Sequence, residues 1–338
     1  HNVRARGLKA CLLRKLGRTE QALVWVRENL TIDPFDFVSG NEEILLTGET
    51  KEKRDAWKEN MRGWREHYLE TARHYAEMGD FCQAVQVLEM YDGEFPMISY
   101  YMAYYTEKSG RQVRELWHQA ENCQPDYCFP NKLEDIRVLE TAMERGCRKK
   151  APYYLGCLFF DRLQWERAQQ LWELAAKEDM DFPTVHRNLA LVYYNKRKDG
   201  QKAREALERA FALNPGDVRV FLELDQLYRK LGDSFWQRVS NMEEHHGLLE
   251  QRDDLYIEYL TLLNLCGAHQ KALDGIMRHK FPPWEGGEGK VTAQYRLALT
   301  ALALEAQERG AYQEAQQMLE QAMVYPENLG EGKLEGSR

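Results

Sequence analysis

Two short stretches contain residue types that hold phosphates or metals in other proteins. Residues 286–291 read GGEGKV, as in a phosphate-binding loop, but Trp284 stands where the first glycine should be and Val291 replaces the metal-holding Ser or Thr. Such loops depend on those backbone amides and that hydroxyl, so we interpret the run as a connector. His118, Cys123 and Cys128 could be metal ligands, yet no second pair stands at a suitable spacing. We predict no cofactor and no metal site.

A third candidate is the polar cluster Glu243 to His246, which contains two acids and two histidines. General acid and base catalysis needs groups that are held in a fixed orientation, and nothing in the sequence orients this cluster. We interpret it as the solvated end of a helix. No HExxH, GxSxG or kinase motif is present, and we expect this part of the protein not to be an enzyme.

The elements that would position a site are best seen in the stretch from Thr184 to Pro215. Its first half places apolar residues on one helical face, and its second half repeats this pattern. Asp199 and Gly200 interrupt the two halves, and proline ends the second one. The stretch therefore predicts two amphipathic helices joined by a turn. Its characteristic positions are Leu189, Ala190, Tyr193, Ala203, Leu207, Ala210 and Pro215.

This order of small and large residues resembles the tetratricopeptide repeat, and one such hairpin cannot bury its apolar face alone. Similar copies recur along most of the chain in about eight units. The resemblance implies a right-handed, all-α solenoid that forms a single array over residues 1–338. Within it we expect a first repeat at 1–34, an insertion of one helix and a solvated connector at 35–62, further repeats at 63–326, and a flexible tail at 327–338. The copies are Asn2–Pro34, Trp64–Pro96, 97–125, Pro152–Met180, Thr184–Pro215, 217–247, 254–281 and Thr292–Pro326.

Composition supports a folded helical protein and argues against some partners. The 338 residues are 43% hydrophobic and 30% charged, without an apolar run long enough to span a bilayer. A formal net charge of -8 argues against a broad phosphate-binding surface, so we expect no nucleic acid partner. Seven cysteines, several at small-residue helix positions, are predicted to be buried thiols.

The beginning of the chain carries two further expectations. It starts at His1 without a methionine or a signal-like apolar segment, so we expect a cytoplasmic fragment of a longer protein. The opening HNVRARGLKACLLRKLGR and the repeat spacing also resemble the carboxy-terminal part of large bacterial proteins with an uncharacterised β-rich region before it.

The resemblance further implies a binding groove, because the first helix of each tetratricopeptide hairpin lines the inner surface of the array. The inward positions not needed for hairpin packing are mostly aromatic, with one cation. Rigid aromatic side chains and a guanidinium suit an extended peptide or a sugar chain. Alternatively, these side chains pack between neighbouring hairpins. The candidate groove residues are Tyr100, Tyr104, Tyr153, Phe160, Arg187 and Tyr194.

The first repeat is strongly basic along its first helix and turn. Such a cluster could bind an acidic peptide or another, acidic part of the same protein, with a contact that weakens as salt rises. An ordinary solvated face is the alternative. The candidate residues of this basic cluster are Arg4, Arg6, Lys9, Arg14, Lys15 and Arg18.

Taken together, these features predict a non-catalytic scaffold that binds a protein or peptide, or another domain of its own chain. The alternative is an accessory domain of a larger carbohydrate-active enzyme, for which a glycan would be the ligand. Paired carboxylates at glycosidase-like separation outside this sequence would favour that alternative.

Overall fold

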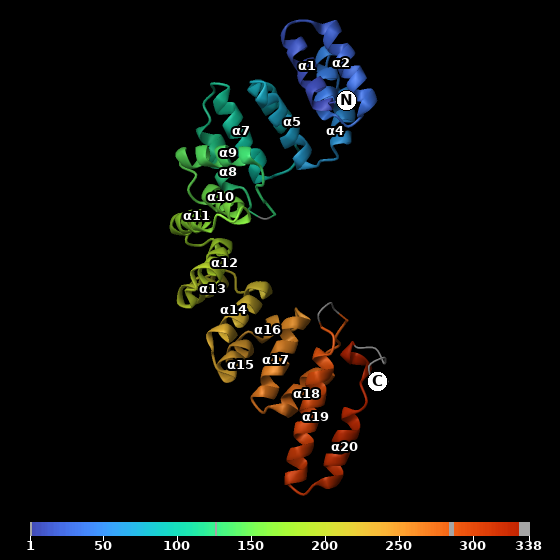
Figure 1. Ribbon diagram of the computed structural model, residues 1–338, viewed down its shortest axis with the longest axis vertical. Coiled ribbons are helices and arrows are strands. Elements are labelled where there is room, and N and C mark those ends of the chain that lie inside the picture. The colour runs from blue at the N-terminus through green and yellow to red at the C-terminus, as the bar shows by residue number, and fades with distance from the viewer. Residues whose placement is uncertain (1, 126, 284–286, 331–338) are drawn as a thin grey trace. The chain divides into compact units, whose positions relative to one another are not determined.

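A computed structural model describes residues 2–125, 127–283 and 287–330 of the chain (Figure 1). The described residues form 20 α-helices and no strand, which confirms the predicted all-α class. The helices group into two compact units, residues 1–180 and 181–338. Within each unit, helices that follow one another in sequence pack side by side as a solenoid of stacked hairpins.

In unit 1, two second helices also pack on the first helix of the next hairpin. In this way α2 packs on α1 and α3, and α6 packs on α5 and α7. Its helices are α1 (Val3–Lys15), α2 (Thr19–Ile32), α3 (Phe37–Thr47), α4 (Lys51–Met61), α5 (Arg65–Glu77), α6 (Phe81–Glu89), α7 (Pro96–Lys108), α8 (Arg114–Asn122), α9 (Leu133–Glu144), α10 (Lys150–Asp161) and α11 (Trp165–Glu178).

Unit 2 follows the same scheme, and α13 and α18 each pack on two first helices. A π-helical turn, Tyr193–Arg197, extends α12 before the next helix begins. The helices of unit 2 are α12 (Pro183–Val192), α13 (Gly200–Leu213), α14 (Val218–Leu231), α15 (Phe235–Glu244), α16 (His246–Leu249), α17 (Asp253–Leu265), α18 (His269–Arg278), α19 (Lys290–Glu308) and α20 (Tyr312–Ala322), and a 3₁₀ turn follows at Glu327–Leu329.

Local sequence signals set the helix ends. The side chain of Asn2 accepts a hydrogen bond from the N–H of Ala5 and so caps α1. Pro96 begins α7, where its missing N–H leaves no hydrogen bond unmade. Gly232 ends α14 with φ of 87°, a left-handed conformation that glycine adopts without steric cost. These signals determine where each of these helices begins or ends.

Two details differ from the sequence-based expectation. Residues 35–62 contain two helices, α3 and α4, rather than one helix and a solvated connector. Asn131 with Glu134 predicts a capping box, but α9 begins at Leu133 and the carboxylate of Asp135 accepts the N–H groups of Asn131 and Lys132, each at 2.9 Å. Lys132 precedes the helix, and the capping carboxylate in a capping box stands three residues after that position. The capping residue is therefore Asp135 rather than Glu134.

All seven cysteines are free thiols. Four of them, Cys11, Cys123, Cys128 and Cys147, are buried, as predicted, whereas Cys82 is exposed. Burial raises the pKa of the Cys157 thiol to about 12, which keeps it protonated and unreactive at neutral pH. Among the described residues, no helix is both long and apolar enough to cross a membrane.

A buried ion pair lies in the core of unit 2. Arg238 is 2% exposed and Asp225 is completely buried, and two hydrogen bonds of 2.9 and 2.5 Å join them. The same guanidinium also reaches Glu258 at 2.7 Å, and that carboxylate is shared with Arg229 on the surface. The pair therefore ties α14, α15 and α17 together.

The two helices of one hairpin approach closely at Gly156 of α10. A Cβ atom at this position would lie 2.4 Å from Nε1 of Trp172, whose indole is buried and donates to the carbonyl of Tyr153. Only glycine leaves room for the indole. The small residue at this repeat position therefore allows α10 and α11 to pack closely.

We expect Gly156→Ala to lower the free energy of unfolding by about 1–3 kcal/mol, because the indole must move out of a packed site. This loss should exceed the gain of up to about 1 kcal/mol that alanine usually brings to a helix. Urea denaturation would measure it. Gly247→Ala is the matched control: a Cβ there meets nothing within 4 Å, so its stability should stay the same or rise slightly.

Candidate functional site

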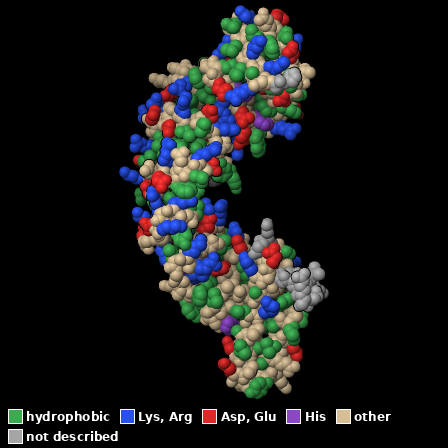
Figure 2. Space-filling view, viewed as in Figure 1, with side chains coloured by type: hydrophobic (Ala, Val, Ile, Leu, Met, Phe, Trp, Pro, Cys, Tyr) green, Lys and Arg blue, Asp and Glu red, His purple; other side chains and the backbone are tan. Residues whose placement is uncertain are grey.

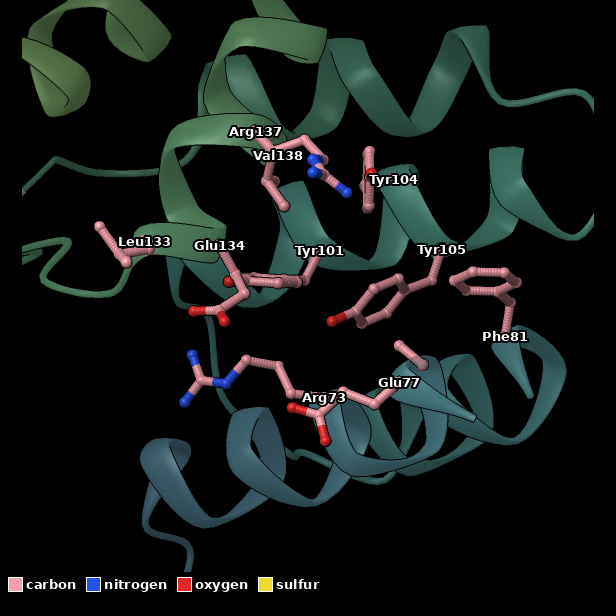
Figure 3. Close-up of a pocket in the computed structure, with 11 residues that line it drawn as sticks. Arg73, Glu77, Phe81, Tyr101, Tyr104, Tyr105, Leu133, Glu134, Arg137 and Val138 are labelled. Atoms are coloured by element: carbon pink, nitrogen blue, oxygen red, sulfur yellow. The ribbon is translucent and has the colours of Figure 1, made fainter. Parts of the chain in front are cut away.

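A pocket of about 340 Å³ opens between α5, α7 and α9 of unit 1 (Figure 3). Aromatic side chains form its walls, and arginine and glutamate side chains stand around them. We call it the tyrosine pocket. Its lining residues are Arg73, Ala76, Glu77, Phe81, Tyr101, Tyr104, Tyr105, Leu133, Glu134, Arg137 and Val138.

Helical spacing divides the tyrosines of α7 between the interior of unit 1 and the pocket. Tyr100 is completely buried, and its hydroxyl donates to Glu121 at 2.9 Å. Tyr101, Tyr104 and Tyr105 lie on the adjacent side, where residues three and four apart share one face. Three of the four rings therefore reach the pocket.

Tyr101 is held rigidly in the wall. Its hydroxyl donates to Asp135 at 2.7 Å, and the other oxygen of that carboxylate caps α9. The guanidinium of Arg73 lies 5.8 Å from the centre of the Tyr101 ring, a cation–π arrangement. Burial, and then the nearby Asp135 carboxylate, raise the pKa of Tyr101, so its hydroxyl stays a donor. These contacts fix the position of the Tyr101 ring in the pocket wall.

Tyr105 presents a polar atom that is not satisfied within the described part of the chain. The residue is 4% exposed, and its ring packs against Phe81 and Tyr101. Its hydroxyl points into the pocket and forms no hydrogen bond with any described residue (Figure 3). Burial raises the pKa of Tyr105, which keeps the hydroxyl protonated. Because this hydroxyl faces the open pocket, it is available to donate a hydrogen bond to an acceptor on a bound ligand.

Tyr104 completes the aromatic wall. It is 8% exposed, and the ammonium of Lys108 lies 5.3 Å from the centre of its ring. Its hydroxyl also has no partner among the described residues.

Charges of both signs surround these rings. Arg4 of α1 contacts both carboxylate oxygens of Glu77, at 2.5 and 2.6 Å, and so neutralises that acid. Arg137 is exposed and forms no ion pair with any residue that the structure describes, and its guanidinium lies beside Tyr104 (Figure 3). Glu134 extends from the same helix toward α5. The pocket therefore offers one uncommitted cation and two hydroxyl donors.

This arrangement suits the binding of a ligand. Rigid aromatic walls hold a flat or apolar group, while Tyr104, Tyr105 and Arg137 can donate to an acceptor on that group. Among the residues the structure covers, no group of three or more His, Cys, Asp or Glu side chains is arranged to hold a metal ion. The pocket thus resembles a recognition site for a side chain.

The four predicted groove residues of unit 1 do not share one surface. Tyr104 lines the tyrosine pocket, and Tyr100 packs in the interior. Tyr153 is 7% exposed and contacts Tyr154, with 5.4 Å between the ring centres. Phe160 packs against Trp172 at 5.4 Å. Of these four, only Tyr104 reaches the pocket, and the others take part mainly in packing, which was the stated alternative.

The two predicted groove residues in unit 2 have partners of their own. Arg187 binds Glu223 through two hydrogen bonds of 2.7 and 2.5 Å. Tyr194 lies in the π-helical turn, with the ammonium of Lys230 5.2 Å from its ring centre. Arg187 also borders a small pocket of about 140 Å³.

Most residues of the tyrosine pocket were not predicted from the sequence. Tyr101 and Tyr105 stand one position after each of the predicted groove residues Tyr100 and Tyr104, and they were not among the candidates. Leu133, at the edge of the pocket, is 77% exposed. The sequence YYMAYY of α7 does indicate a surface site, because one face of a helix cannot bury so many tyrosines.

The basic cluster of the first repeat is largely neutralised within unit 1. Arg6 binds Glu28 at 3.0 Å, and Lys9 lies over the ring of Trp25. Figure 2 shows Lys and Arg side chains interleaved with Asp and Glu over unit 1, without a large basic area on this face. The further pairs are Arg4 with Glu77, Arg14 with Glu42 and Asp80, and Lys15 with Asp80. Arg18 is exposed. A salt-sensitive contact through this cluster stays a prediction.

The other chemical candidates have ordinary surroundings. Residues 284–286 of the glycine-rich run lie outside the described residues. His118 shares a hydrogen bond with Asn122, and Cys123 and Cys128 are buried. Glu243 binds Lys271 near the end of α15, in line with the interpretation of the Glu/His cluster as a helix end.

Comparison with known proteins gives matches among solved structures, and no family model matches the chain. The C-terminal part of a TPR repeat-containing protein from Cytophaga hutchinsonii is 13% identical over 80% of this chain and 99% of that one, with a TM-score of 0.41. PilF of Pseudomonas aeruginosa is 18% identical over 63% of this chain and 89% of that one, with a TM-score of 0.35. YrrB, described as a TPR protein with an unusual peptide-binding site, is 15% identical over 64% and 88%, with a TM-score of 0.27.

The repeats of this chain are tetratricopeptide-like. The small residues that carry the resemblance, such as Ala10, Ala22, Ala168 and Ala203, are completely buried where two helices approach. The tetratricopeptide-like chain therefore uses these positions for close packing.

Proposed function

We propose that this chain is a non-catalytic scaffold that binds a protein partner, and that unit 1 receives an extended peptide of that partner in the tyrosine pocket. One observation supports the proposal most strongly: the ring of Tyr105 is held in the wall of an open pocket, and its hydroxyl points into that pocket without a hydrogen-bond partner among the described residues. A bound peptide would supply the missing acceptor.

The surroundings of the pocket favour a chain of residues over a small ligand. Leu133 is 77% exposed at the edge of the pocket, so apolar contact area continues outside it. Arg137 is also exposed beside the opening and has no ion pair with a described residue. A peptide could place an acceptor against Tyr105 and a carboxylate near Arg137 while its next apolar residue packs on Leu133.

A glycan is the rival ligand, since a sugar ring can also pack on aromatic side chains. It would correspond to an accessory domain of a carbohydrate-active enzyme. Hydroxyl-rich ligands would use the Tyr104 and Tyr105 donors but would gain less from the cation of Arg137 than an anionic peptide group would.

The test is selection of peptides from a random display library on the full chain, in parallel with a glycan array. Synthetic versions of the selected peptides are then titrated by fluorescence anisotropy. Tyr105→Phe removes one neutral hydrogen bond and should weaken binding by about 2- to 10-fold. Arg137→Ala removes a charge-assisted bond and should weaken it by roughly 10- to 150-fold.

Matched controls are Tyr312→Phe on α20 and Arg114→Ala on α8, both exposed. Neither should change the affinity. Selected peptides that bind both pocket variants as tightly as the native chain, or binding to glycans alone, would refute the peptide proposal.

A further inference from the structure

A second hollow, separate from the tyrosine pocket, lies in unit 1 between α9 and α11, with α10 as its floor. Its cavity volume is about 600 Å³, and it shares no lining residue with the tyrosine pocket. We call it the α9–α11 groove. Its lining residues are Glu140, Met143, Glu144, Arg148, Leu155, Phe159, Arg167, Gln170, Leu171 and Leu174.

The groove occupies the place of a helix that the array lacks. In several hairpins of the chain, the second helix packs on its own first helix and on the next first helix, as α2 does on α1 and α3 and α6 does on α5 and α7. Helix α9 stacks between α7 and α10 like a first helix, but residues 145–149 lead directly into α10. Among the described residues, α9 thus has no second helix of its own, and the space between α9 and α11 is open.

The floor of this space is apolar. Leu155 and Phe159 of α10 are each 2% exposed, and they form its base. Met143 of α9 and Leu171 and Leu174 of α11 are half-buried along the sides. A stripe of apolar side chains between two helices is the surface onto which the apolar face of a third helix packs.

The two sides of the groove differ in charge. Glu140 and Glu144 stand on α9, whereas Arg167 stands on α11 and Arg148 stands in the connection between α9 and α10. Arg167 lies over the ring of Phe159 at 3.8 Å and reaches Glu140 at 3.7 Å. Both side chains of that ion pair are about half exposed, at 54% and 50%, so a ligand could displace it with little loss.

We propose that the α9–α11 groove binds an amphipathic helix of a partner protein. The apolar stripe of this helix packs on Leu155, Phe159 and Leu171. Its basic flank faces Glu140 and Glu144, and its acidic flank faces Arg167. The bound helix completes the array at the vacant second-helix position.

The experiment uses three fluorescein-labelled synthetic helices of about four turns with the same leucine stripe. One carries Lys along one flank and Glu along the other, the second carries Lys on both flanks, and the third carries Glu on both. Anisotropy titration of the full chain should show that the mixed helix binds about tenfold more tightly than either uniform helix.

Two variants test the site. Leu171→Glu should reduce binding of the mixed helix at least tenfold, whereas Leu319→Glu on α20, a half-exposed control, should not change it. The double variant Glu140→Lys/Glu144→Lys makes both sides basic, so the preferred probe should change from the mixed helix to the all-Glu helix. Circular dichroism checks that each variant is folded.

Equal affinity for the three probes, or no effect of Leu171→Glu, would overturn the proposal. So would sedimentation showing that Leu171→Glu abolishes self-association of the native chain, because the groove would then hold a second copy. Variants of the tyrosine pocket, such as Tyr105→Phe, should leave probe binding unchanged, so this test is independent of the proposed peptide site.

Discussion

Replacing Arg238 by methionine is expected to lower the free energy of unfolding by about 3–5 kcal/mol, because it leaves a buried charge without its partner. Asp225 is completely buried and receives two hydrogen bonds from this guanidinium. Methionine has a similar length but no charge, so the carboxylate must become protonated or open to water. Urea denaturation followed by circular dichroism would measure the loss as a shift of the transition midpoint.

A second substitution separates the charge from the packing. In the double variant Arg238→Met/Asp225→Leu both buried charges are gone, and Glu258 keeps its surface partner Arg229. Most of the lost stability should return, as apolar pairs of similar volume often replace buried ion pairs without cost. A double variant as unstable as Arg238→Met alone would show that shape, rather than charge, is what this site requires.

The double variant Tyr104→Ala/Tyr153→Ala is also expected to be strongly destabilised. The two side chains are only 8% and 7% exposed, and removing a buried aromatic side chain typically costs about 3–5 kcal/mol. The two rings belong to different hairpins of unit 1, so their losses should add approximately. Thermal and urea unfolding would both report the change.

This expectation determines how the binding site must be tested. Loss of binding in the alanine variant would not distinguish a ligand contact from unfolding. Tyr105→Phe keeps the ring and removes only a hydroxyl that has no partner among the described residues, so its stability should change little. If the alanine double variant kept its native stability, Tyr104 and Tyr153 would be surface residues and the packing described above would be wrong.

Much of the fold follows from sequence patterns because each hairpin is specified locally. The spacing of Leu189, Ala203 and Ala210 predicts two packed helices, and all three side chains are buried as expected. The limits of this reasoning appear at residues 35–62, where the resemblance to the repeat is weak but α3 and α4 still form. Their burial depends on neighbouring hairpins, as the completely buried Glu42 shows through its bond to Arg14 of α1.

The candidate site was less predictable for a geometric reason. A repeat alignment assigns Tyr100 and Tyr104 to an inward face, but the four-residue spacing does not decide which of them reaches solvent. That depends on α9, whose position beside α7 leaves Tyr104 and Tyr105 at an opening while Tyr100 contacts Glu121. The groove beside α11 likewise lies where residues 145–149 lead from α9 directly into α10, and a periodic pattern does not indicate such a short connection.

The central claim is that unit 1 binds a peptide in the tyrosine pocket, and hydrogen exchange of the full chain with and without a selected peptide tests it most directly. Exchange measured by mass spectrometry reports which backbone segments are protected. We predict slower exchange in α5, α7 and the first turns of α9 when the peptide is bound, and no such protection in Tyr105→Phe/Arg137→Ala at the same peptide concentration. Protection confined to unit 2, or equal protection in the double variant, would contradict the claim.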